Sequence, residues 1–182
     1  LIIVNGEGTI HHSSERAENI ISISFFSYVH RIRCVLINAT YEDNNHKINN
    51  FTRLFDAVYV RENKSYLTLN KYSIDSNIVP DLSYYVDKPE TTKSLVNVGV
   101  TDSVFINITD ELYNFAFDNN FKFLPILSVN TTINSNYSNN FIDTPESYYS
   151  EVNNSLFLIS GRYHAICMAI QSKTPFYAIS SN

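Results

Sequence analysis

An arginine and a histidine stand two residues apart in this sequence, at Arg162 and His164. The guanidinium of arginine keeps its charge across the physiological pH range and pairs with a carboxylate or phosphate through two parallel hydrogen bonds. The imidazole of histidine gains and loses a proton near neutral pH. Together they predict a site that binds an anion and transfers a proton. The alternative is that His164 is a capping or core histidine.

The residues around this pair predict a strand, a turn and a helix. Residues 155–160 are mostly apolar and branched or aromatic, which is typical of a buried strand, and Gly161 is expected to let the backbone turn. Apolar side chains recur at helical spacing over residues 162–173, before a Thr-Pro pair and a further strand at 176–179. The pair therefore lies at a helix N-terminus and at the carboxyl end of a strand, two places that favour anionic ligands.

The first sixty residues show the same alternation of strands and helices. Apolar runs predict buried parallel strands, the first of which is expected to be covered on both faces, and helical patterns lie between them. The expected strands are residues 1–4, 33–38 and 57–60, and the expected helices are residues 15–29 and 44–54. This order implies parallel pairing with right-handed crossovers, and hence an α/β fold.

Two of these strands end in residues that suit ligand binding. Gly6 and Gly8 flank Glu7 directly after the first strand, which predicts a tight turn that a ligand approaches closely, with Glu7 projecting from the strand end. Arg61 ends the third strand, so we expect it at the same edge as Glu7. The alternatives are an ordinary strand-to-helix turn and a surface Arg61 paired with Glu62 or Asp56.

A polar stretch that contains a proline, at residues 87–93, is expected to connect two halves of the chain. We expect an N-terminal Rossmann-like half over residues 1–88, truncated at its start, and a C-terminal Rossmann-like half over residues 97–182 that carries the arginine–histidine turn. The second half is expected to contain strands at 96–100 and 121–129, helices at 110–119 and from 144 onward, and an Asn-rich loop at 130–140.

Composition narrows the function classes. The 182 residues are 44% hydrophobic and 17% charged, which is ordinary for a globular protein with a core. A net charge of -5 argues against a broad nucleic-acid interface. No apolar run reaches the roughly 18 residues needed to cross a bilayer. Cys34 and Cys167 lack metal-ligand spacing and are expected to be reduced core residues of a cytoplasmic protein.

The Arg-x-His at this turn resembles the polysaccharide pyruvyl transferase family. Further segments resemble that family in the same order along the chain, and together they span nearly all of it. They are Asn-Gly-Glu-Gly-Thr-Ile-His at 5–11, Val-Arg-Glu-x-x-Ser at 60–65, Val-Pro-Asp-Leu at 79–82, Val-Thr-Asp-Ser-Val at 100–104, and Thr-Pro-Phe at 174–176 with Ser-Asn at 181–182. Each is weak alone, but the ordered series is specific.

The resemblance implies a GT-B-like fold, in which two Rossmann-like halves with parallel sheets face a cleft. It implies a transferase that moves a pyruvyl group from phosphoenolpyruvate to a sugar of a polysaccharide or its precursor, forming a ketal. We expect His164 to act as the general acid and Glu7 to orient or deprotonate the acceptor. No metal and no cofactor besides the donor are expected. The expected substrate-binding residues are Arg162, Arg61, Ser65, Asn5, Gly6 and Gly8.

Other interpretations stay open from the sequence. A GT-B-type glycosyltransferase with a nucleotide-sugar donor keeps the fold and changes the donor, and a non-catalytic carbohydrate-binding domain keeps the fold alone. His11 and His12 are weaker catalytic candidates that follow the glycine-rich turn. The chain starts without Met inside an apparent strand and stops where family members usually continue, so we expect it to be part of a longer polypeptide with flanking domains.

Overall fold

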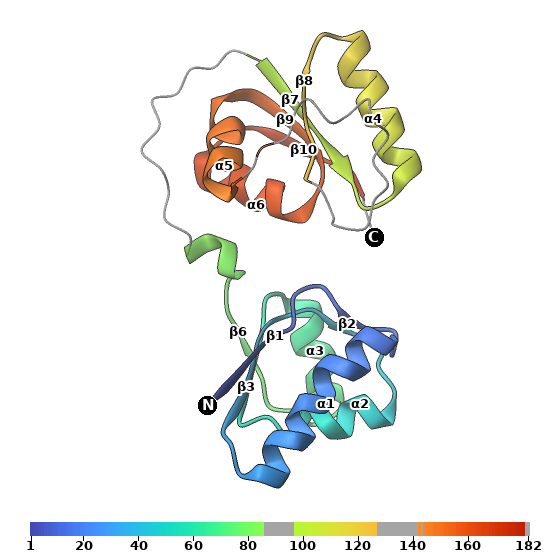
Figure 1. The fold of residues 1–182 in the computed structure, drawn as a ribbon, viewed down its shortest axis with the longest axis vertical. Helices are drawn as coiled ribbons and strands as arrows, with labels where there is room; N and C mark the ends of the chain where they lie inside the picture. Colours follow the sequence, from blue (N-terminus) through green and yellow to red (C-terminus); the bar gives the residue numbers. More distant parts are fainter. Residues whose placement is uncertain (86–96, 127–141, 143, 181–182) are drawn as a thin grey trace. The chain divides into compact units, whose positions relative to one another are not determined.

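The computed structural model describes residues 1–85, 97–126, 142 and 144–180. In this part the chain is an α/β protein with parallel sheets and six α-helices, and it divides into two compact units, residues 1–82 and 83–182 (Figure 1). The expected connection at 87–93 and the expected Asn-rich loop at 130–140 lie outside the described residues. Within the described ranges, no helix has both the length and the apolar character needed to span a bilayer.

The first unit is built on four parallel strands whose spatial order follows the chain. They are β1 (Ile2–Asn5), β3 (Cys34–Ala39), β5 (Ala57–Val60) and β6 (Asn77–Ile78), in that order. The helices between them are α1 (Glu15–His30), α2 (His46–Thr52) and α3 (Asn63–Lys71). A separate parallel pair, β2 (Ile10–His11) with β4 (Tyr41–Glu42), was not expected from the sequence.

All three helices of this unit contribute to one core. Right-handed crossovers that always step in the same direction put every helix on the same face of the sheet. Accordingly, one hydrophobic cluster joins the sheet to Ile21 of α1, Ile48 of α2 and Leu69 of α3. The expectation that β1 is covered on both faces is wrong for the described residues: Val4 is buried, whereas Ile3 is 60% exposed.

The second unit has helices on both faces of its sheet because its strand order reverses. The parallel strands lie in the order β10 (Phe176–Ala178), β9 (Ser155–Gly161), β7 (Asn97–Ser103) and β8 (Lys122–Leu124). The chain steps from β7 to β8 on one side, then returns to place β9 on the other side of β7. One core cluster therefore packs under α4 (Ile106–Asp118), and another under α5 (Pro145–Asn154) and α6 (Tyr163–Ser172).

Local sequence signals explain where several elements begin. Helix α5 starts at Pro145, as expected, and the Thr144 side chain caps it by accepting from the backbone N–H of Ser147. Helix α3 starts at Asn63, directly after Glu62, whose side chain caps it. Cys34 and Cys167 are both buried and neither is part of a disulfide among the described residues, which confirms the expectation that they are core residues.

We predict that Leu158→Ala in β9 lowers the free energy of unfolding by about 2–5 kcal/mol, because its side chain is fully buried and the change leaves a cavity. Leu156 lies in the same strand and is 48% exposed, so Leu156→Ala is the matched control and is expected to cost less than about 1 kcal/mol. Urea unfolding followed by circular dichroism measures both. Equal losses would show that β9 is not packed as described.

Candidate functional site

The turn from β9 to α6 is held by hydroxyl groups from two neighbouring strands. Arg162 is the N-cap residue of α6, and its backbone N–H donates to the Ser160 hydroxyl at 3.0 Å. The Ser160 hydroxyl lies 3.0 Å from that of Thr101 in β7, which also accepts from the Gly161 N–H at 3.2 Å. Ser160 and Thr101 are fully buried. These bonds fix the backbone that carries Arg162 and, in the first turn of α6, His164.

Gly161 is needed because two strands pack closely at this position, and not because its backbone takes a positive φ. We expected it to let the chain turn, but none of the glycines has a positive φ. A Cβ at this position would lie 2.9 Å from the Cβ of Ser103 and 3.0 Å from the carbonyl oxygen of Asp102. Since Ser103 lies opposite Gly161 in the parallel register, only glycine lets β7 and β9 come this close at their carboxyl ends.

Arg162 forms a nearly buried ion pair with Asp102, a residue that the sequence had shown only as part of a family segment. The Arg162 Nη2 donates to Oδ2 of Asp102, and the other carboxylate oxygen accepts from the Ile126 N–H at 2.9 Å. The two side chains are 15% and 7% exposed. Burial raises the pKa of Asp102 above its ordinary value, and the Arg162 guanidinium opposes that rise.

This ion pair lies where the strand order of the second unit reverses. Asp102 belongs to β7, and Arg162 directly follows β9, the strand on the opposite side of β7 from β8. In open α/β sheets, ligands bind at the carboxyl ends of the strands at such a switch point. The signal available in the sequence was the polar segment Thr101-Asp102-Ser103 at the end of an apolar strand. The ion pair between Asp102 and Arg162 could be identified only once the structure gave the order of the strands in the sheet.

The first unit has a similar arginine–aspartate pair at the carboxyl edge of its sheet. Arg61 follows β5, and its Nη1 donates to Oδ2 of Asp81 at 2.9 Å, while its Nε donates to the Thr40 hydroxyl at 2.9 Å. Asp81 is 1% exposed and Arg61 is 11% exposed. The alternative of a surface arginine paired with Glu62 or Asp56 is therefore wrong, since the carboxylate partner is Asp81.

Glu62 and Ser65 hold the backbone next to Arg61. The Glu62 carboxylate accepts from the Ser65 N–H at 2.9 Å and from the Ser65 hydroxyl, so Glu62 caps α3. The same hydroxyl accepts from the Tyr41 N–H at 2.6 Å, and Ser65 is fully buried. In the structure, Ser65 thus joins the start of α3 to the start of β4, and its predicted contact with substrate stays a prediction.

The turn after β1 lies beside Arg61. The Thr40 N–H donates to the Glu7 carbonyl oxygen at 2.7 Å, and Thr40 also contacts Arg61, so Glu7 and Arg61 lie at the same edge, as expected. Glu7 itself takes the positive φ of 41°, not its glycine neighbours. Asn5 donates its side-chain N–H to the Glu7 carboxylate at 3.2 Å and restrains that side chain.

The two glycines of this turn differ in the space around them. A Cβ on Gly6 would lie 2.8 Å from the Cβ of Ala39 and 2.9 Å from Cδ1 of Ile10, both inside the core. A Cβ on Gly8 would meet only Nη2 of Arg61, at 3.2 Å. Gly6 is therefore needed for packing, whereas Gly8 keeps open the space next to the guanidinium.

The remaining histidine candidates are His11, the last residue of β2, and His12, directly after it. His11 pairs in register with Glu42, and its Nδ1 is buried without a hydrogen-bond partner among the described residues. His12 is exposed and lies 3.7 Å from the Asp43 carboxylate. The described residues contain no group of three or more His, Cys, Asp or Glu side chains arranged to hold a metal ion.

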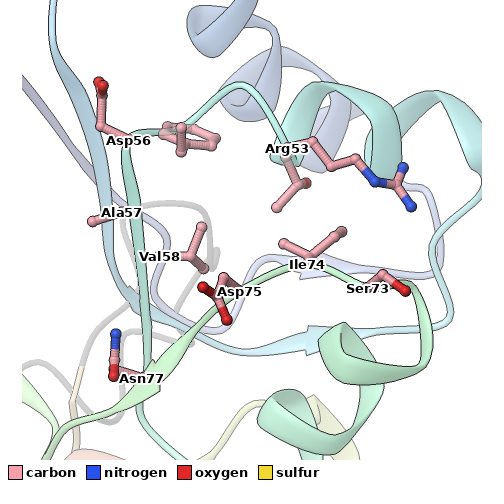
Figure 2. A pocket seen from close by; sticks show the side chains of 10 residues that line it. Arg53, Asp56, Ala57, Val58, Ser73, Ile74, Asp75 and Asn77 are labelled. Carbon is pink, nitrogen blue, oxygen red and sulfur yellow. The ribbon is translucent and has the colours of Figure 1, made fainter.

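A pocket of about 390 Å³ lies at the opposite edge of the first sheet. Figure 2 shows the side chains that line it. The pocket is lined by residues at the amino ends of β5 and β6, among them Asp56, Asp75 and Asn77, together with Arg53. None of the residues that the sequence suggested for catalysis or binding lines this pocket. The candidate residues lie instead in two groups, one at the carboxyl edge of the sheet in each unit.

The fold and these edges define an α/β protein with an arginine held by a buried aspartate at the carboxyl edge of each parallel sheet. A sequence model described as polysaccharide pyruvyl transferase matches residues 1–182, the whole chain. The chain therefore belongs to the polysaccharide pyruvyl transferase family. Among curated proteins, none matches this sequence.

We predict that Gly6→Ala lowers the free energy of unfolding by about 1–3 kcal/mol, because the added methyl group overpacks the core next to Ala39. Gly8→Ala is the matched control and is expected to change stability by no more than about 0.5 kcal/mol, since only the end of a long side chain must move. Urea unfolding compares the two variants. A Gly8→Ala loss as large as that of Gly6→Ala would contradict the described turn.

We also predict a pH-dependent loss of stability in Arg162→Met. The substitution removes the cation that lowers the pKa of Asp102, while burial still raises that pKa above 3.8. The folded state then holds the Asp102 proton more tightly than the unfolded chain, so stability is greatest below about pH 4 and falls as the pH rises through the raised pKa. Above it, we expect a loss of about 3–5 kcal/mol relative to wild type.

Urea unfolding at a series of pH values measures this loss, with Arg162→Met/Asp102→Asn as the control. The double variant has no carboxyl group at position 102, so its stability relative to wild type is expected to lose the added pH dependence. A deficit in Arg162→Met that is the same at every pH would show that the ion pair does not exist in the folded protein.

Proposed function

We propose that this chain transfers a pyruvyl group from phosphoenolpyruvate to a saccharide, as the family name suggests. The observation that carries the proposal is the position of Arg162 and His164 at the start of α6, where the strand order of the second sheet reverses. The proposal includes a polysaccharide or its precursor as the acceptor and a ketal as the product. The two buried cysteine thiols fit a reducing compartment, and we place the reaction in the cytoplasm.

Binding of the donor needs cations because phosphoenolpyruvate carries a phosphate and a carboxylate. The Arg162 guanidinium has five N–H donors, and its bond to Asp102 through Nη2 leaves others for an oxyanion. In the part of the chain that the structure describes, no side chain caps the first turn of α6, so its N–H groups add to the attraction for an anion. Arg61 offers a second cation in the other unit.

The reaction forms two C–O bonds to C2 of the donor. One acceptor hydroxyl oxygen bonds to C2 while an acid delivers a proton to C3, which becomes a methyl group, and a base takes the hydroxyl proton. A second hydroxyl of the same acceptor then bonds to C2 as the C2–O bond to phosphate breaks, and its proton leaves with the phosphate. The products are a cyclic ketal that keeps the carboxylate, and inorganic phosphate.

His164 and Glu7 are the proposed proton carriers. His164 is exposed in the first turn of α6, two residues after Arg162, and an imidazole suits proton transfer near neutral pH. Glu7 is exposed and its carboxylate is restrained by Asn5, which suits a group that orients or deprotonates the acceptor. This division of roles requires the GT-B-like arrangement that the family resemblance implies.

We predict that phosphoenolpyruvate binds saturably to wild type in calorimetry and that Arg162→Ala abolishes the binding, because the guanidinium supplies the fixed cation. His164→Asn is expected to keep donor binding while phosphate release, assayed with a panel of saccharides, falls by about 10²- to 10⁴-fold. His46→Asn changes an exposed histidine at the start of α2 and is the matched control.

Other outcomes of the same titration contradict the proposal. Saturable binding of a nucleotide sugar in place of phosphoenolpyruvate would make the protein a glycosyltransferase. Binding of neither ligand would point to a carbohydrate-binding domain without this activity. Wild-type turnover that survives His164→Asn would remove His164 from the chemistry and leave the anion site intact.

A further inference from the structure

Asp102 links the carboxyl ends of three strands through one carboxylate. It lies in β7, it accepts from the Ile126 N–H just after β8, and it accepts from Arg162 just after β9. Its side chain is 7% exposed. Because one oxygen is fixed by a backbone group of a neighbouring segment, the other oxygen points at the guanidinium from a fixed position.

Neither anion binding nor stability explains why a carboxylate lies next to Arg162. A negative charge next to a site for an anion weakens the binding of that anion by Coulomb repulsion. Burying the ion pair also costs desolvation energy, so stability alone does not favour it over apolar side chains. A gain in orientation offsets both costs, since a free arginine side chain has many rotamers and a guanidinium recognises oxyanions only in a defined plane.

The first unit contains the same arrangement independently. Asp81, which is 1% exposed, follows β6 and bonds to the Arg61 guanidinium at the end of the neighbouring strand β5. In both units, therefore, a buried aspartate beside one strand end holds an arginine at the end of the next strand. The repetition in two separate sheets favours a shared role over a local accident of packing.

We propose that Asp102 is a positioning residue, which holds the Arg162 guanidinium in the plane that receives an oxyanion of phosphoenolpyruvate. The inference rests on the proposed function for the identity of the ligand. It assigns Asp102 no contact with the donor: the carboxylate acts through Arg162. Loss of the carboxylate then frees the guanidinium, so binding weakens even though a negative charge next to the anion has been removed.

Calorimetric titration of phosphoenolpyruvate into Asp102→Asn tests the sign of this effect. Positioning predicts binding weaker by about tenfold or more, the value of a hydrogen bond to a charged group. Repulsion alone predicts tighter binding, so equal or tighter binding overturns the proposal. Asp118→Asn removes the same charge from the exposed carboxyl end of α4, at the other edge of the sheet, and is expected to leave affinity unchanged.

A second measurement decides the proposal without any ligand. The Nε–H of Arg162 is buried, so its NMR signal, assigned by its loss in Arg162→Lys, is expected to exchange slowly with solvent in wild type. Asp102→Asn is expected to speed this exchange by about tenfold or more while the rest of the spectrum stays folded. Unchanged exchange overturns the positioning role. If wild type fails to bind phosphoenolpyruvate, the proposed function fails, and this signal still decides whether Asp102 holds Arg162.

Discussion

The right-handedness of strand–helix–strand crossovers is the constraint on which the rest of this structure depends. In the first unit every crossover steps the same way, so the helices share one face and the strands end at one edge. In the second unit the step from β8 to β9 goes back past β7, which puts helices on both faces and separates the loops that follow β7 and β9. That separation exposes a helix N-terminus at a strand edge, where Arg162 lies.

A buried arginine–aspartate pair lies at the carboxyl edge of each of the two sheets. A buried ion pair gains little or no net stability over apolar residues of the same size, yet each unit keeps one at its carboxyl edge. The neighbouring groups are organised in the same way: hydroxyls of Thr101 and Ser160 fix one turn, and Thr40 fixes the other. Polar side chains that are held in place by bonds to rigid strands suit a site whose cations must not move on binding.

Apolar periodicity in the sequence was enough to predict most strands and helices, including β5, α1 and the β9–α6 turn with Arg162 and His164. It was not enough to predict the partners of the arginines, because Asp102 and Arg162 meet only through the pairing of strands far apart in the chain. Apolar periodicity also could not predict the roles of the glycines. A sequence does not show that Gly161 faces a neighbouring backbone, or that Glu7 takes the positive φ in its turn. The β2–β4 pair could not be predicted because a strand of two residues is too short to show an alternation of apolar and polar residues.

The central claim is that phosphoenolpyruvate binds at the start of α6, against Arg162. Hydrogen–deuterium exchange of the wild-type chain, with and without saturating phosphoenolpyruvate, tests it most directly because it locates the ligand without a substitution. The account predicts slower exchange in the peptide that covers the first turn of α6, with no change around Asp56 and Asp75 in the pocket of Figure 2. Slower exchange around that pocket, with the first turn of α6 unaffected, would contradict it.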